Sequence, residues 1–305
     1  MDSKYSGVWP TMVTAFTEEG TLDIEGNKAI TEYLIGKGSN GLFAVCQSSE
    51  MFMLSLEEKV ALATCVVEAA GGRVPVIASG HTSDALEDQI EELRAISQTG
   101  VDAVVIVSNR LAKQEEGSDV LIGNLKAIMD AIPEVKFGVY ECPYPYRRLL
   151  TDEELKWCAE TGRVVFLKDV SCDAATERRR TEVVKGTGLN LFNANTETLL
   201  ESLRAGYNGY NGVMGNFHID LYQWLYTHYK EALEAADALQ SDLTKYSDIE
   251  NHGYPINAKY HMRGDGVDMS LYSRRLSAEK FGKAEIELVE ALISWEEETR
   301  KKLGL

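Results

Sequence analysis

The sequence predicts an α/β protein, specifically a (β/α)₈ (TIM) barrel with a C-terminal helical extension. Short apolar runs alternate with amphipathic stretches, and the alternation gives eight units of roughly 25 to 30 residues within a chain of 305 residues. Barrels of this kind have about 250 residues. An open doubly wound sheet would also alternate, but it usually carries a glycine-rich phosphate loop after its first strand. The first strand here ends in "TAFTEEGTLD", which contains no such loop, so the barrel is favoured.

The predicted strands are apolar runs bounded by Gly, Pro or polar residues, as in "PVIASG". Most of them are four to six residues long, the usual length of a buried strand. They are Val8–Phe16, Gly41–Val45, Val74–Ala78, Ala103–Val107, Phe137–Tyr140, Val164–Leu167, Leu189–Asn193 and Gly209–Met214.

Between these runs the hydrophobic period changes to that of a helix. The period is clearest where four apolar residues share one helical face: Leu86, Ile90, Leu93 and Ile96. Helix starts are marked by two capping boxes, Ser55–Glu58 and Thr151–Glu154. Gly71, Gly72 and Gly100 stand where helix C-caps are expected.

From about Leu221 onward the alternation stops. Residues 221–243 and 277–302 have helical patterns, with "DIENHGYPINAKYHMRG" between them. No low-complexity linker separates these segments from the rest of the chain. We therefore expect one compact unit, in which residues 1–220 form the barrel and residues 221–305 pack on it as a helical extension.

Composition and charge exclude several classes of protein. The formal net charge is −17, so no basic stripe is available for a nucleic-acid backbone, and anionic membranes are mildly disfavoured. The N-terminus lacks a signal-peptide pattern, and no apolar run reaches spanning length. The five cysteines are odd in number and form no CxxC pair, which indicates reduced thiols. We expect a cytoplasmic protein without a nucleic-acid or membrane partner.

Barrel enzymes place their chemistry at the carboxyl ends of the strands. In this chain those ends carry many polar or reactive side chains. They are Cys46, Gln47, Ser48, Ser49, Glu50, His81, Ser108, Asn109, Arg110, Tyr140, Glu141, Cys142, Lys168, Asp169, Asn193, Asn195, Asn216 and His218.

Lys168 is the most informative of them, because it directly follows a buried apolar run. Loss of hydration favours the neutral amine, which is the nucleophile that forms a Schiff base with a ketone. The protonated imine withdraws electrons, so the adjacent carbon can lose a proton or break a C–C bond. Tyr140, at the end of the neighbouring strand, is placed to shuttle protons. The alternative is structural: Lys168 would pair with Asp169 or a rim glutamate, and Tyr140 would be a rim aromatic.

Several short segments resemble the dihydrodipicolinate synthase / N-acetylneuraminate lyase family, over roughly residues 7–290. "GVWPTMVTAF" is similar to the family's opening strand, and "VYECPYP" to its Tyr-Asn-x-Pro segment. "FLKDVSCD" resembles the strand-six Gly-x-Lys-[Glu/Asp] segment, and "LESLRAGYNGYNGVMGNFHID" a late Gly-x-x-Gly…Asn stretch. These segments occur in the family's order and at its intervals.

The resemblance implies a class I aldolase-type lyase that acts on pyruvate or another 2-keto acid. Lys168 matches the Schiff-base lysine, and Tyr140 matches the tyrosine that transfers protons at the imine. No cofactor is implied, because the lysine itself serves as the electron sink. Members of the family are usually homotetramers built from dimers, so a homo-oligomer, tetramer or dimer, is expected.

The strand-two motif departs from the family's Gly-[Thr/Ser]-Thr-Gly-Glu pattern. Glu50 and Ser48 match, but Gln47 replaces the hydroxyl that relays protons to the tyrosine, and an amide is a poor proton carrier. Gln47, Ser48 and Ser49 are predicted to line the region that binds the carboxylate and relays protons. Asn211 is predicted to contact the substrate or to support the site, with Glu50 and Asn195 as supporting residues.

Two other departures concern the second substrate. "SNRLAK" lacks the tyrosine that synthases lend to the neighbouring subunit, and Pro145 stands where they carry an arginine, with Arg147 and Arg148 just beyond. An aldol or retro-aldol lyase on a sugar-acid-like substrate is therefore favoured. A keto-sugar-acid dehydratase and 4-hydroxy-tetrahydrodipicolinate synthase proper are the alternatives.

Two further hypotheses belong to other classes. Soft ligands near the predicted barrel mouth could hold zinc: Cys46, Cys142, Cys172, His81 and His218. The chain has no H-x-H, H-E-x-x-H or CxxC spacing, so we expect no metal. A non-catalytic barrel that binds a keto acid is the other hypothesis, since Gln47 and the missing tyrosine could indicate lost turnover.

Overall fold

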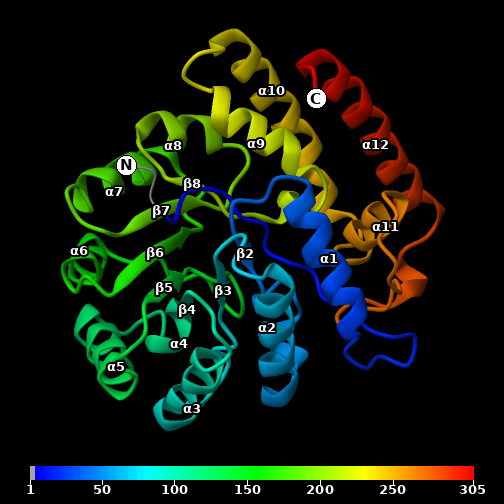
Figure 1. The fold of residues 1–305 in the computed structure, drawn as a ribbon. Helices are drawn as coiled ribbons and strands as arrows, with labels where there is room; N and C mark the ends of the chain where they lie inside the picture. The colour runs from blue at the N-terminus through cyan, green and yellow to red at the C-terminus, as the bar shows by residue number, and fades with distance from the viewer. Residues whose placement is uncertain (1–3) are drawn as a thin grey trace.

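A closed ring of parallel strands forms the centre of the molecule in the computed structural model, which describes residues 4–305 (Figure 1). The order is β1-β8-β7-β6-β5-β4-β3-β2, and a parallel bridge from Thr11 to Phe43 joins the two ends. The predicted (β/α)₈ barrel is thus confirmed; residues 1–3 of its predicted segment lie outside the described residues. The strands are β1 (Gly7–Val8), β2 (Leu42–Phe43), β3 (Val76–Ala78), β4 (Ala103–Val107), β5 (Phe137–Tyr140), β6 (Val164–Asp169), β7 (Asn190–Asn193) and β8 (Gly209–Tyr210).

The strands β4 and β5 have the predicted bounds, whereas β1, β2, β3, β7 and β8 are shorter than predicted. β6 is longer, because its neighbours offer ladder partners beyond Leu167: Lys168 pairs with Tyr140 and Phe192, and Asp169 pairs with Asn193. The expectation that Lys168 follows the strand is therefore wrong. Lys168 is a strand residue, and its backbone is held on both sides.

Helices surround the strands, and the predicted caps account for several of their ends. Ser55 and Glu58 form the capping box of α2, Thr151 and Glu154 that of α6, and Gly71 closes α2 with a φ of 55°. Gly100 lies just beyond the C-cap of α3. The helices of this part are α1 (Ile24–Gly36), α2 (Leu56–Ala70), α3 (Leu86–Ser97), α4 (Ser108–Leu111), α5 (Ser118–Ala131), α6 (Asp152–Glu160), α7 (Ala174–Val183), α8 (Leu199–Ala205) and α9 (Ile219–His228).

The C-terminal helices gather on one side of the barrel (Figure 1). They are α10 (Leu233–Tyr246), α11 (Ile256–Gly264) and α12 (Lys283–Leu303), with short 3₁₀ turns η3 (Ser247–Asn251) and η4 (Ala278–Lys280). The helical pattern of residues 221–243 is divided between α9 and α10, and α11 lies where no helix was predicted. The predicted boundary after residue 220 falls within α9, which packs against β1.

Aromatic rings fill the inside of the barrel below Lys168. The ring centres of Trp9, Phe166 and Phe192 lie 4.6 to 5.8 Å apart. Phe166 and Lys168 are two residues apart in β6, so they share a face of the strand. The apolar layer therefore forms a dry floor beneath the lysine.

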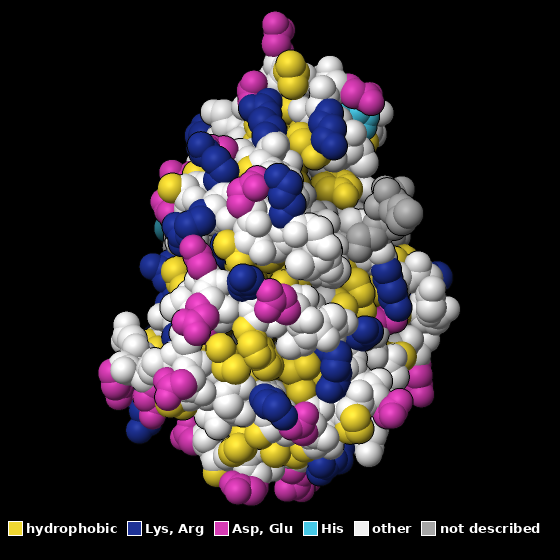
Figure 2. Space-filling view, turned by 90° about the vertical axis from the view of Figure 1, so that its left-hand side faces the viewer, with side chains coloured by type: hydrophobic (Ala, Val, Ile, Leu, Met, Phe, Trp, Pro, Cys, Tyr) yellow, Lys and Arg dark blue, Asp and Glu magenta, His cyan; other side chains and the backbone are white. Residues whose placement is uncertain are grey.

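The surface is mixed in charge. Figure 2 shows Lys and Arg side chains interspersed with Asp and Glu side chains on the face it draws, rather than gathered in one stripe. Within residues 4–305, no helix is both long and apolar enough to cross a bilayer. All five cysteines are free.

Candidate active site

Lys168 and Tyr140 lie side by side on β6 and β5 at the bottom of a cavity. They are register partners, and the lysine Nζ is 4.7 Å from the centre of the tyrosine ring. Phe43 of β2 covers another side, with its ring centre 5.9 Å from Nζ. Lys168 and Tyr140 are each only 4% exposed. The structure thus brings together the two residues that the sequence predicts to be catalytic.

Within residues 4–305, the buried amine of Lys168 forms no ion pair or hydrogen bond with another residue, and its neighbours are the rings of Tyr140 and Phe43. Burial lowers its pKa to about 8, while the Cys46 and Cys142 thiols and the Glu250 carboxylate act in the opposite direction. At pH 7, roughly one amine in ten is then neutral, against fewer than about one in a thousand for an ordinary lysine. The site keeps a usable fraction of nucleophile at neutral pH.

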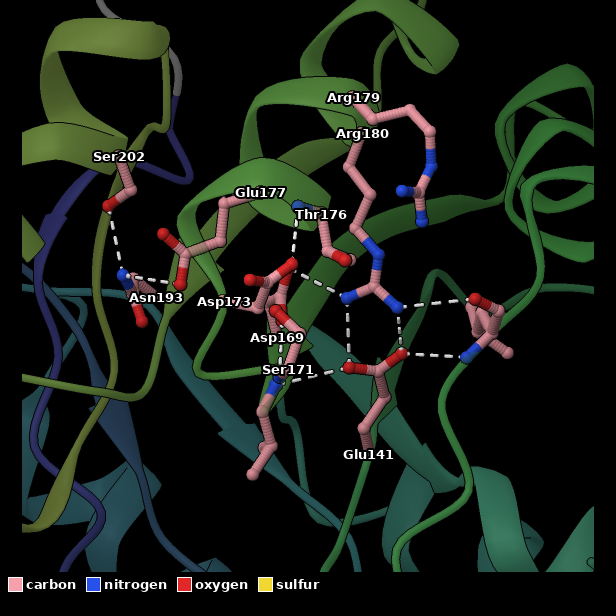
Figure 3. A network of polar contacts seen from close by, with 12 residues as sticks. Glu141, Asp169, Ser171, Asp173, Thr176, Glu177, Arg179, Arg180, Asn193 and Ser202 are labelled. Atoms are coloured by element: carbon pink, nitrogen blue, oxygen red, sulfur yellow. Dashed lines mark hydrogen bonds and ion pairs between the residues drawn. The ribbon is translucent and has the colours of Figure 1, made fainter. Parts of the chain in front are cut away.

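Asp169 pairs with Arg180 and not with Lys168, contrary to one form of the structural alternative considered above. Successive strand residues point to opposite faces, so Asp169 and Glu141 face the outer helices while Lys168 and Tyr140 face the barrel interior. Figure 3 shows Arg180 of α7 between the two carboxylates. The guanidinium lies 2.5 and 2.9 Å from the oxygens of Glu141 and 2.6 Å from Asp169 Oδ2. Arg180 therefore ties β5 to β6 directly behind the lysine–tyrosine pair.

The Tyr140 hydroxyl donates a hydrogen bond to Gln47 Oε1 at 3.2 Å, and the Cys142 thiol donates to the same oxygen at 3.5 Å. Burial, together with the neighbouring thiols, raises the pKa of Tyr140 well above its usual value. The tyrosine is therefore protonated at rest. Its donated bond fixes the phenol orientation and leaves the oxygen lone pairs free to accept.

The turn after β2 places its two serines differently. Ser48 lines the cavity and its hydroxyl donates to Thr11 Oγ1 at 3.1 Å. Ser49 folds back on its own turn: its hydroxyl accepts from the Cys46 N–H at 2.5 Å and donates to the Cys46 carbonyl at 2.8 Å. Ser49 is fully buried and does not line the cavity, so the geometry does not support its predicted contact with substrate.

Asn195 and Asn211 also differ in position relative to the cavity. Asn195, expected only to support the site, lines the cavity. Asn211 is fully buried and donates to the Trp9 carbonyl at 2.7 Å, so it joins β8 to β1 below the cavity. This position does not favour a substrate contact for Asn211, and its supporting role stays a prediction.

Glu50 fastens the turn after β2 to the C-terminal segment. It has a left-handed backbone, with φ of 62°, and its Oε2 accepts from the Ser273 hydroxyl at 3.0 Å and the Arg275 N–H at 2.8 Å. Its Oε1 lies 3.9 Å from Nζ of Lys259, a buried lysine on α11 whose pKa burial lowers to about 8. Glu50 thus holds the turn after β2 through partners that the sequence did not indicate, and its supporting role at the site stays a prediction.

The cavity above Lys168 has a volume of about 390 Å³. Its lining combines strand-end residues with residues from the C-terminal extension. The residues are Gln47, Ser48, Tyr140, Pro143, Lys168, Val170, Cys172, Ala194, Asn195, Thr196, Gly212, Val213, Ser247, Glu250, Asn251, Tyr254 and Arg275. Five of them, from Ser247 to Arg275, belong to the extension and were not predicted. They come from turns rather than from a periodic element, and only the polar run "SDIEN" hints at them.

The candidate metal ligands are not assembled. In the part of the chain that the structure describes, no group of three or more His, Cys, Asp or Glu side chains is arranged to hold an ion. His218 instead pairs with Glu296 through Nδ1 at 2.8 Å, and His81 Nε2 lies 2.9 Å from Gln89 Oε1.

A buried amine beside a phenol at the carboxyl ends of barrel strands suits the chemistry of barrel aldolases and lyases, which attack a carbonyl carbon and move protons. The chain belongs to the dihydrodipicolinate synthetase family, whose model matches residues 4–292. The predicted family and the predicted enzyme class are both confirmed by this match.

Several known proteins are similar to this chain. The 4-hydroxy-tetrahydrodipicolinate synthase of Ruegeria pomeroyi is 30% identical over 209 residues, 68% of each chain. The synthase of Roseobacter denitrificans is 33% identical, but the match spans only 56% of this chain and 57% of that enzyme. The putative 2-dehydro-3-deoxy-D-gluconate aldolase YagE of Escherichia coli is 27% identical over 216 residues, 70% of each chain.

Solved structures agree on the fold. YagE in complex with pyruvate superposes with a TM-score of 0.86 at 21% identity, covering 96% of this chain and 99% of that one. A catalytic lysine mutant of the Ruminococcus gnavus sialic acid aldolase gives a TM-score of 0.87 at 20% identity, covering 98% of both chains.

Proposed function

We propose that this protein is a lyase that forms a Schiff base between Lys168 and pyruvate or a related 2-keto acid, and that it makes or breaks a C–C bond beside the imine. The observation that carries the proposal is the buried, unpaired amine of Lys168 next to the Tyr140 hydroxyl on the adjacent strand. The description of YagE in complex with pyruvate supports the choice of keto acid.

The proposed cleavage begins when neutral Nζ of Lys168 attacks the C2 carbonyl of the substrate. The resulting carbinolamine hydroxyl takes the Tyr140 proton and leaves as water, which gives a protonated imine and a tyrosinate. The tyrosinate then takes the proton of the C4 hydroxyl, C4 becomes an aldehyde, and the electrons of the C3–C4 bond form the enamine. Tyr140 returns the proton to C3, and water releases the keto acid. Condensation is the reverse sequence.

This cycle explains how the site works with Gln47 in place of a hydroxyl. Tyr140 exchanges one proton with the substrate and recovers it, so Gln47 orients the phenol without having to carry a proton. Because Gln47 Oε1 already accepts from Tyr140 and Cys142, its Nε2 donors remain for the substrate. We assign binding of the keto-acid carboxylate to the Gln47 amide and to the Ser48 hydroxyl, whose proton turns from Thr11 Oγ1 to the carboxylate when substrate binds; both residues line the cavity.

The rest of the lining favours a hydroxylated substrate. Asn195 and Asn251 bring amide groups to the same cavity, which suits a sugar-acid-like 2-keto acid. Because relatives with 30 to 33% identity are named 4-hydroxy-tetrahydrodipicolinate synthase, that synthesis is the second candidate. A homo-oligomer, tetramer or dimer, and a cytoplasmic location stay predictions; sedimentation of the purified protein tests the first.

The test is release of pyruvate, coupled to lactate dehydrogenase, from 2-keto-3-deoxygluconate and N-acetylneuraminate, with pyruvate plus aspartate semialdehyde tested in the reverse direction. We expect turnover with one of these substrates, no turnover with Lys168→Ala, and normal turnover with Lys126→Ala, which removes an exposed lysine paired with Asp130. Turnover that survives in Lys168→Ala would contradict the proposal. Imine formation without turnover on any substrate would favour a keto-acid-binding barrel.

A further inference from the structure

Arg275 is a charged residue of the cavity whose side chain takes no part in the proposed reaction. It lies on the segment between α11 and η4, is exposed, and lines the lysine cavity as well as an adjoining cavity of about 340 Å³. Among residues 4–305, no side chain or carbonyl pairs with its guanidinium, although acidic residues outnumber basic ones by 48 to 31. A free guanidinium in so acidic a protein is available for a ligand.

The backbone that carries Arg275 is held rigidly. Its N–H donates to Glu50 Oε2 at 2.8 Å, and the Ser273 hydroxyl donates to the same oxygen at 3.0 Å. The preceding Arg274 binds both oxygens of Glu58, at 2.5 and 2.7 Å, and the Met53 carbonyl at 2.8 Å. The adjacent arginine thus serves structure, whereas Arg275 is presented at the cavity by a fixed loop.

Depth in the cavity indicates which part of a substrate Arg275 can meet. Lys168, Tyr140 and Ser48 form the floor and are 4%, 4% and 6% exposed. The carboxylate of a 2-keto acid is bonded to C2, the carbon that Lys168 attacks, so it is held at the floor. Arg275 is exposed at the rim, and the group that it meets therefore belongs to the distal end of the substrate.

The chemistry of the rim selects an anion. A guanidinium forms bidentate, charge-assisted hydrogen bonds with a carboxylate. Among the residues that line the two cavities, the cationic side chains are Lys168, which attacks the ketone, and Arg275. The adjoining cavity also has an apolar wall, where the rings of Phe52 and Tyr144 lie 5.0 Å apart, which can hold a short carbon chain.

We propose that Arg275 determines specificity by binding a carboxylate at the distal end of the substrate, so that the aldehyde fragment made or consumed at Lys168 is anionic. The proposal rests on the proposed function of the same site. The arginines that follow the Tyr140 segment are not equivalent. Arg148 is buried in a pair with Glu154, and Arg147 donates to the Val170 carbonyl and does not line the lysine cavity.

The test is borohydride trapping on Lys168 with two 2-keto acids of equal length, 2-ketoadipate and 2-ketohexanoate, which differ in the distal carboxylate. We expect the wild-type protein to reach half-saturation at about tenfold or more lower concentration with 2-ketoadipate, the effect of one hydrogen bond to a charged group. Arg275→Gln should lose this preference, and Arg275→Lys should keep part of it. Arg263→Gln removes an exposed arginine of α11 that lines neither cavity, and should behave as wild type.

Pyruvate has no distal group, so it distinguishes binding of a distal carboxylate by Arg275 from binding of the keto-acid carboxylate. Its half-saturation should change by less than about twofold in Arg275→Gln; a large rise would mean that Arg275 binds the keto-acid carboxylate, and would overturn the inference. Equal trapping of the two longer acids by the wild-type protein, or an unchanged preference in Arg275→Gln, would overturn it as well. Absence of any adduct in the wild-type protein would overturn the proposed function and this inference with it.

Discussion

Removal of the Arg180 guanidinium should destabilise the barrel strongly, because it leaves two carboxylates buried without a counter-ion. Arg180 is 1% exposed, Glu141 0% and Asp169 1%. Removing one partner of a buried ion pair costs about 3 to 5 kcal/mol. Each carboxylate keeps two other donors, which favours the lower end of that range. They are Leu150 N–H and Val170 N–H for Glu141, and Ser171 N–H and the Tyr207 hydroxyl for Asp169. We therefore expect Arg180→Met to lose about 3 kcal/mol at neutral pH.

The loss should depend on pH in a defined direction. Burial raises the pKa of the Glu141 carboxyl and Asp169 raises it further, while Arg180 opposes both. Without Arg180 the folded-state pKa rises more, so the folded variant holds a proton that the unfolded chain releases. A group with a raised folded-state pKa stabilises most below its unfolded value and loses that contribution as pH rises through the folded value. The deficit of Arg180→Met should therefore be smaller at pH 5 than at pH 8.

Urea unfolding, followed by tryptophan fluorescence at fixed protein concentration, measures both effects. Arg178→Met is the matched control, because Arg178 lies on the same helix in an exposed pair with Glu201, and it should cost less than about 1 kcal/mol. Combining Arg180→Met with Glu141→Gln and Asp169→Asn should recover much of the stability. A deficit equal to that of the control, or one that is the same at pH 5 and pH 8, would refute the reasoning.

Three further predictions concern the site and the extension. Tyr140→Phe should lower turnover by about 100-fold or more, because the proton carrier is lost; steady-state kinetics within about fivefold of wild type would exclude this role. The rate of pyruvate adduct formation should rise with pH around a midpoint near 8, because Lys168 reacts as the neutral amine, and a midpoint above 10 would contradict its lowered pKa. Glu296→Gln should cost about 1 to 3 kcal/mol at pH 7. Although burial opposes them, His261 and His218 hold the Glu296 pKa well below its usual range. Its contribution is therefore present above the unfolded value of about 4.3 and is lost only as pH falls below that value, so the difference in urea midpoint between variant and wild type should persist at pH 5 and shrink only below about pH 4.

The sequence predicted the parts of the fold that depend on local pattern. The apolar runs predict the bounds of β4 and β5. The sequence also places Lys168 and Tyr140 at the ends of neighbouring strands, because consecutive strands of a parallel barrel lie side by side. The same local logic missed the pairing that extends β6 past Lys168. That extension depends on ladder partners in β5 and β7, which the β6 sequence does not contain.

The remaining errors concern residues whose positions are set by tertiary packing. Ser49 follows Ser48, but the turn geometry directs its hydroxyl onto Cys46 rather than into the cavity. Glu250 and Arg275 reach the cavity from turns of the extension, and no periodic pattern marks such positions. A motif can therefore indicate the floor of a barrel site, whereas the rim follows from how distant segments pack.

The most direct test of the central claim is borohydride reduction of the protein with pyruvate, followed by peptide mass analysis of wild type and Lys168→Ala. Lys259 is a built-in comparison, because it is also buried and its pKa is also lowered to about 8, yet it lines neither cavity. The account predicts a reduced pyruvate adduct on the peptide that contains Lys168 and none in Lys168→Ala. An adduct on Lys259, or one that persists in Lys168→Ala, would contradict it.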